Sequence, residues 1–150
     1  MKQFLLIGFL FFFGFIAMAQ SGKQVKWSFT AKKIADKTYE VHMTADINGN
    51  WHIYAQDAGE GPQPTAFNFT KNPLLSFDGE VKEVGKMKKV YEEAFKSEVR
   101  FYEKSVNFVQ VVKVKGSAKT NLAGKVEFMV CDDKQCLPPT EIPFAVNIGG

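Results

Sequence analysis

Apolar and polar residues alternate along most of the chain beyond residue 20, and this pattern restricts the fold more than any other feature. In residues 26–32 and 39–46 an aromatic or aliphatic side chain stands at nearly every second position. Successive side chains of a β-strand point to opposite faces, so each stretch predicts a strand with one buried face. Seven to nine short strands are expected, with candidates at residues 26–32, 39–46, 51–54, 65–69, 79–84, 98–102, 106–114, 125–131 and 142–148.

The segments between these strands contain the residues that favour turns. A tight turn is predicted at residues 48–50, a longer loop at residues 59–64, and further turns at residues 72–73, 115–117 and 121–124. No stretch predicts a long helix, and residues 90–96 fit either one helical turn or a structured loop. Many short strands without intervening helices favour an all-β fold, an immunoglobulin-like antiparallel β-sandwich, with a small barrel as the alternative.

The first 19 residues predict a secretory signal peptide rather than part of the fold. A lysine at position 2 precedes an apolar run over residues 4–16, and Ala17-Met18-Ala19 has the small residues of a cleavage site. The alternative is a retained membrane anchor, but the run is shorter than the ~20 apolar residues that a membrane span needs. We therefore expect cleavage near Ala19, a single domain over residues 20–150 with no retained anchor, and a periplasmic or secreted location.

Composition and charge exclude several classes of protein. Of 150 residues, 45% are hydrophobic and 23% are charged, which is typical of a globular domain and unlike a disordered chain. The net charge of +3 is spread along the sequence without a basic run. Binding to nucleic acid therefore has no support.

The two cysteines, Cys131 and Cys136, carry the most specific chemical signal. Four polar residues separate them, which fits a hairpin turn across which two Cβ atoms can approach to the ~4 Å that a disulfide requires. A disulfide that closes about six residues constrains the unfolded chain by only roughly 2 kcal/mol. This small effect favours redox exchange over a structural staple, although both remain open on spacing alone.

Metal ligation is a third alternative for the cysteines, but two thiolates need further ligands. His42 and His52 fall in or beside strands, at spacings that do not recruit them to the cysteine pair. We expect each histidine to be a solvent-facing or half-buried strand residue. Neither a metal nor an organic cofactor is expected.

Residues 128–141, Phe-Met-Val-Cys-Asp-Asp-Lys-Gln-Cys-Leu-Pro-Pro-Thr-Glu, resemble the signature of the N-terminal periplasmic domain of the thiol:disulfide interchange protein DsbD. This family is also called the disulfide bond corrector domain. Residues 48–54 and 91–102 are similar to the family's glycine turn with its aromatic residues and to its cap-loop region. The resemblance implies an immunoglobulin-like sandwich whose cysteine pair carries reducing equivalents between proteins.

The resemblance also implies roles for individual residues. Cys136 matches the cysteine that forms a mixed disulfide with a partner, and Cys131 matches the one that resolves it. Phe95 falls at the aromatic cap that shields the cysteines, with Tyr91 as the alternative cap. Two further aromatic residues, Trp51 and Tyr54, are possible walls of the site.

Two functions therefore stand against each other. The first is thiol:disulfide interchange with periplasmic thioredoxin-like or disulfide isomerase proteins, supplied by a separate membrane electron donor. The second is a non-catalytic immunoglobulin-like module that binds a protein partner and whose disulfide only stiffens a turn.

Overall fold

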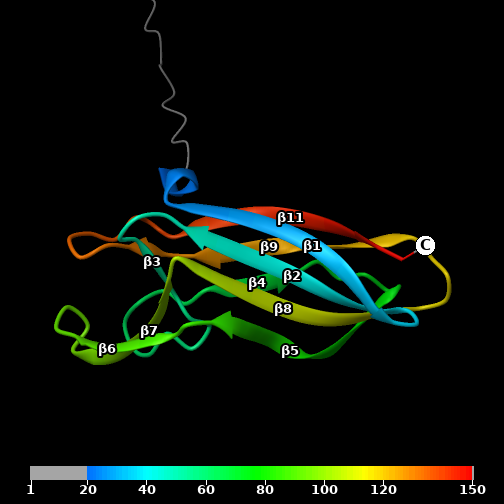
Figure 1. Cartoon of the computed structure of the whole chain (residues 1–150), viewed down its shortest axis with the longest axis horizontal. Helices are drawn as coiled ribbons and strands as arrows, with labels where there is room; N and C mark the ends of the chain where they lie inside the picture. The colour runs from blue at the N-terminus through cyan, green and yellow to red at the C-terminus, as the bar shows by residue number, and fades with distance from the viewer. Residues whose placement is uncertain (1–19, 150) are drawn as a thin grey trace, which may run out of the picture.

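The computed structural model describes residues 20–149, so the predicted signal peptide lies outside the described residues. Within this range a short 3-10 helix, η1 (Gln20–Lys23), precedes eleven β-strands (Figure 1). The strands are β1 (Val25–Ala35), β2 (Thr38–Ile47), β3 (His52–Tyr54), β4 (Ala66–Phe69), β5 (Leu75–Gly85), β6 (Lys88–Glu92), β7 (Ser97–Glu103), β8 (Ser105–Val114), β9 (Thr120–Phe128), β10 (Val130–Cys131) and β11 (Thr140–Ile148). No helix in residues 20–149 is long and apolar enough to cross a membrane.

The strands form three antiparallel sheets with the orders β1-β2-β8-β5, β11-β9-β4 and β10-β3-β7-β6. The first two face each other as a sandwich, and aromatic side chains such as Phe29 and Phe144, whose ring centroids are 4.7 Å apart, stack between them. The third sheet lies at one end of the sandwich, away from the end that β11 reaches (Figure 1). The architecture is the immunoglobulin-like β-sandwich that the sequence predicts.

Two strands of the third sheet are nearly continuous in sequence with strands of the other two sheets. Only Lys104 separates β7 from β8, and only Met129 separates β9 from β10. Lys104 has a φ of 68°, a left-handed conformation that redirects the chain from one strand into the next. The end sheet is therefore anchored to the sandwich by strands that simply continue into it.

The core follows from the alternation in the sequence. On β2 the inward positions Val41, Met43 and Ala45 are fully buried, while their neighbours are more exposed. Phe108 on β8 lies at the centre, and its ring centroid is 5.0 Å from that of Phe67 and 5.9 Å from that of Trp27. Burial of these large rings, together with the aliphatic residues around them, removes the apolar surface from water that stabilises the sandwich.

Two expectations for local structure are wrong. Residues 90–96 are not one helical turn or one structured loop throughout, because residues 90–92 end β6, which pairs with β7, and only residues 93–96 form the turn of this hairpin. The turn predicted at residues 121–124 is instead the first half of β9, a strand that pairs with both β11 and β4. Gly124 lies there because a Cβ would stand 2.7 Å from the carbonyl oxygen of Asn68 and 3.1 Å from the Phe144 ring. This glycine therefore permits close packing and does not mark a turn.

Phe108→Ala should lower the free energy of unfolding by about 3–5 kcal/mol, because it leaves a cavity among packed aromatic rings. Phe77, on the edge strand β5, is 47% exposed and offers a matched control. Phe77→Ala should cost less than about 1 kcal/mol. Equilibrium unfolding in urea measures both values, and equal losses would contradict the assignment of Phe108 to the centre of the core.

Candidate redox site

Cys131 and Cys136 form a disulfide across a hairpin turn at the end of β10. The two residues face each other in an isolated antiparallel bridge, with an S–S bond of 2.01 Å and a Cα–Cα distance of 4.0 Å. Backbone hydrogen bonds of 2.9 Å frame the turn on both sides of the bridge, from the amide of Asp132 to the carbonyl of Gln135 and from Leu137 to Val130. The short polar segment therefore closes the hairpin that the spacing predicts.

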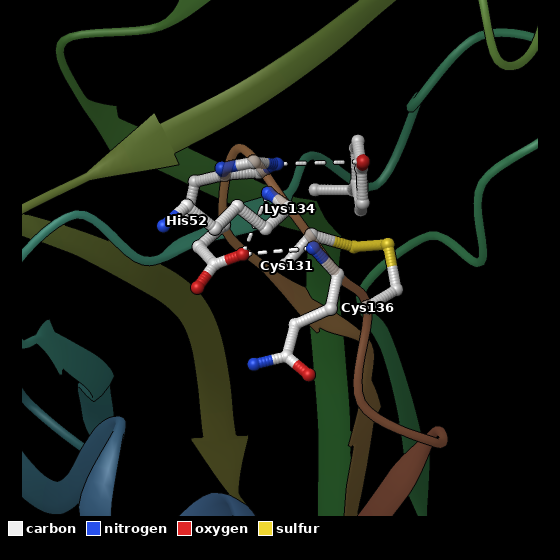
Figure 2. The surroundings of a disulfide bond; sticks show 7 residues. His52, Cys131, Lys134 and Cys136 are labelled. Carbon is white, nitrogen blue, oxygen red and sulfur yellow. Dashed lines mark hydrogen bonds between the residues drawn. A yellow bond between two sulfur atoms is a disulfide. The ribbon is translucent and has the colours of Figure 1, made fainter.

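The side chain of Asp132 organises this turn. Its Oδ1 accepts hydrogen bonds of 2.8 Å from the backbone amides of Lys134 and Gln135 (Figure 2). Both hydrogen bonds stabilise the carboxylate and lower the pKa of Asp132, and the bond from the Lys134 amide has the larger effect. An aspartate at the first position of the loop thus replaces the backbone hydrogen bonds that a tighter turn would supply.

The two sulfur-bearing residues differ in accessibility. Cys131 belongs to β10 and is 1% exposed, whereas Cys136 follows the turn and is exposed to solvent. Thiol–disulfide exchange requires approach of an incoming sulfur along the S–S bond. An outside thiol can therefore reach Cys136, while Cys131 is shielded by the protein.

The floor of the site is built by β3, which lies between β10 and β7. Cys131 stands opposite His52 in the register, and Tyr54 stands opposite Phe101 on the next strand. These four side chains share one face of the end sheet because their positions alternate with those that enter the main core. Under the disulfide lies a small apolar cluster, here called the site cluster, which contains Tyr54, Ala58, Val99, Phe101 and Cys131.

His52 is buried beside the disulfide, with only 6% of its surface exposed. Its Nε2 lies 3.4 Å from the hydroxyl oxygen of Tyr54, and its ring packs on Phe101 at a centroid distance of 4.5 Å. Figure 2 shows the imidazole on the Cys131 side of the disulfide. The expectation that this histidine is solvent-facing or half-buried is wrong, because β3 is covered on both faces.

Burial sets the charge state of this pair of side chains. Desolvation lowers the pKa of His52 and outweighs the opposing effect of three nearby carboxylates, so the imidazole is neutral at pH 7. Burial, together with the negative charge of Glu92, raises the pKa of Tyr54 to about 12. The site therefore holds a neutral imidazole next to a neutral phenol.

The aromatic residues singled out in the sequence divide into two groups. Tyr54 and Phe95 line one pocket together with both cysteines and His52. Trp51 packs against the main core, and Tyr91 is 60% exposed on β6. The structure thus brings two of the four aromatic residues to the cysteine pair and leaves the other two away from it.

Phe95 lies in the turn between β6 and β7 and is half-buried. Its ring meets that of Tyr54 edge-on, with centroids 6.4 Å apart, and it packs against the site cluster. Gly61 lies beneath it, where a Cβ would stand 2.5 Å from Cδ1 of Phe95. The missing side chain at this position leaves the space that Phe95 occupies.

The other histidine lies elsewhere in the sandwich. His42 is half-buried on β2, and its Nδ1 is 2.9 Å from the side-chain amide nitrogen of Asn107. Within residues 20–149 no group of three or more histidine, cysteine, aspartate or glutamate side chains is arranged to hold a metal ion.

Sequence reasoning did not place His52 or Glu92 in the pocket, and His52 is the buried one of the two. The available signal was the spacing of His52 and Tyr54, which are two positions apart and so share a face of a strand. That signal became informative only once β3 was placed next to β10, a pairing that the local sequence does not encode.

Fold and site together define an immunoglobulin-like domain that carries a cysteine pair in a surface hairpin at the end of the sandwich. The chain belongs to the family of the N-terminal domain of the thiol:disulfide interchange protein DsbD, whose family model matches residues 19–147. No curated protein matches the sequence.

Solved structures of low sequence identity share the fold. The N-terminal periplasmic domain of ScsB from Proteus mirabilis is 17% identical with a TM-score of 0.60, over 88% of this chain and 49% of that one. The chain thus spans about half of the ScsB chain. The reduced N-terminal domain of DsbD from Neisseria meningitidis is 16% identical with a TM-score of 0.58, over 87% of this chain and 90% of that one.

Proposed function

We propose that this protein exchanges thiols and disulfides with partner proteins through Cys131 and Cys136. The observation that carries the proposal is the asymmetry of the pair: Cys136 is exposed, whereas the bonded Cys131 is 1% exposed. A partner sulfur can therefore engage one cysteine, and the other is held in place to complete the exchange. Membership in the family of the DsbD N-terminal domain supports the same chemistry.

The exchange balances without a cofactor. In the reduced protein the Cys136 thiolate attacks a partner disulfide, forms a mixed disulfide and releases one partner thiolate. The Cys131 thiolate then attacks Sγ of Cys136, restores the bond seen here and releases the second partner thiolate. Two electrons pass from the cysteine pair to the partner in each cycle.

The cycle needs a source of electrons and a recipient. We propose periplasmic thioredoxin-like or disulfide isomerase proteins as recipients and a separate membrane protein as the donor. Cleavage of the signal peptide near Ala19 would deliver the domain to the periplasm, or outside the cell, where unprotected thiols become oxidised. Such a location requires a donor that keeps the pair reduced.

Reduction potential separates exchange from the alternative of a binding module with a structural disulfide. We expect the purified protein, equilibrated with glutathione or dithiothreitol buffers, to have a potential more positive than about −270 mV. Trapping free thiols at each buffer ratio gives the value. A potential below about −300 mV would indicate a structural disulfide and favour the binding module.

Single cysteine variants test which sulfur meets the partner. Cys131→Ala leaves the exposed Cys136, so it should form a stable mixed disulfide rapidly with a small aromatic disulfide. Cys136→Ala leaves the buried Cys131 and should react at least about tenfold more slowly, because access limits exchange. Rates of thiolate release, with mass spectrometry of the adducts, measure the difference. The reverse order of rates would contradict the assigned roles.

We also propose that Phe95 caps the disulfide. Phe95→Ala should increase the rate at which dithiothreitol reduces the bond by several-fold, because the ring no longer covers the pocket. Tyr91→Ala is the matched control, since Tyr91 is 60% exposed on the neighbouring strand, and it should leave the rate unchanged. A faster reaction in the Tyr91 variant alone would identify Tyr91 as the cap.

A further inference from the structure

The exchange cycle leaves the role of His52 unexplained. His52 is buried, stands opposite Cys131 in the pairing of β3 with β10, and lines the same pocket as both cysteines. Its Nε2 lies 3.4 Å from the Tyr54 hydroxyl, a contact through which a proton can pass. The imidazole loses its hydration when it is buried beside the site cluster, and an apolar side chain could pack there without this cost in free energy.

The chemistry of Cys131 creates a need for a base at this position. Only a thiolate attacks a disulfide, and a thiol buried in apolar surroundings has a raised pKa. At neutral pH the reduced Cys131 would therefore hold its proton at the moment when it must attack the mixed disulfide. A proton acceptor inside the site removes this barrier.

The charged groups that act on His52 come from β6, β7 and the hairpin turn. Glu103 lies on β7, and its carboxylate makes a 2.6 Å ion pair with Lys88 of β6. Asp132 and Asp133 lie in the hairpin turn, and their charges partly offset the effect of burial on the imidazole. Burial still dominates and lowers the pKa of His52, which keeps the ring in the form that can accept a proton.

Other pocket residues are poorer acceptors. Asp132 already uses Oδ1 for two backbone hydrogen bonds in the turn, and its lowered pKa makes it a weak base. Asp133 is exposed. Glu92 also lines the pocket, and burial, with a smaller effect of Asp133, raises the pKa of its carboxyl group. It is carried by β6, which pairs only with β7, whereas His52 stands directly opposite Cys131 in the register. His52 is the neutral base on the strand next to Cys131.

We propose that His52 accepts the proton of the Cys131 thiol, directly or through the Tyr54 hydroxyl, when Cys131 resolves the mixed disulfide; the inference rests on the proposed exchange function. In this step the Cys131 S–H bond breaks and its proton moves to the imidazole. The sulfur attacks Sγ of Cys136, the new S–S bond forms, and the partner leaves as a thiolate. The imidazolium then returns its proton to solvent, so charge and electrons balance.

The test is a stopped-flow reaction of the fully reduced protein with 5,5′-dithiobis(2-nitrobenzoate), which separates the two steps. Attack by Cys136 releases the first coloured thiolate, and attack by Cys131 on the mixed disulfide releases the second. His52→Gln should slow the second release about 100-fold at pH 7 and leave the first nearly unchanged. The same substitution at His42, on β2 in the main sandwich, is the matched control and should change neither.

A second variant and a pH profile separate proton transfer from packing. His52→Phe keeps an aromatic ring against Phe101 but has no base, so it should slow the second release as much as His52→Gln does. In the wild type the second rate should level off above the imidazole pKa, whereas in both variants it should rise about tenfold per pH unit up to the thiol pKa. The reduction potential should stay the same, because a base alters the rate and not the equilibrium.

Three outcomes would overturn the inference. The first is a second release within twofold of the wild type in both variants at pH 7, and the second is restoration of the rate by phenylalanine. The third is a wild-type second rate that itself rises about tenfold per pH unit through neutrality. Failure of the proposed function looks different, because the reduction potential would then lie in the range of structural disulfides, whatever the rate of the second release.

Discussion

The pairing of β3 with strands on both of its sides is the interaction on which the site depends. This strand has only three residues, yet it is hydrogen-bonded to β10 on one edge and to β7 on the other. Ile53 enters the main core through one face, while His52 and Tyr54 emerge on the opposite face next to the disulfide. Burial of Ile53 therefore fixes how His52 and Tyr54 project from the sheet into the pocket beside the disulfide.

The hairpin turn divides one disulfide into two chemical environments. Cys131 is the last residue of β10 and is buried in the end sheet, whereas Cys136 follows the turn and is exposed to solvent. The bond itself contributes little to stability, since closing about six residues restricts the unfolded chain by only ~2 kcal/mol. In the proposed exchange, what matters is which sulfur a partner can reach. The end sheet determines this by burying Cys131, whereas the four loop residues do not.

Structure that depends on neighbouring residues could be predicted from the sequence, whereas structure that depends on the pairing of distant segments could not. The cysteine hairpin and the alternating strands β1, β2 and β8 could be predicted, because both depend on neighbouring residues. Strand β6 was missed because its residues are almost all exposed, so it shows no buried face. The environment of His52 could not be predicted, because it arises from pairing between segments far apart in the chain. The wrong turn prediction at Gly124 has a related cause. This glycine allows the backbone of the neighbouring strand β4 to approach closely, and the local sequence does not show that strand.

The position of the cap turn connects stability with access to the disulfide. Strand β6 is the outermost strand of the end sheet, four of its five residues are exposed, and its turn carries Phe95. Segments with few buried contacts open at low free-energy cost, independently of the core. In the proposed capping role, Phe95 would leave the pocket by losing its contacts with Tyr54 and Gly61, while the pairing of β3 with β10 and β7 stays intact. The proposed cap thus lies on an edge hairpin, whereas His52 and Tyr54 lie on a strand that is paired on both sides.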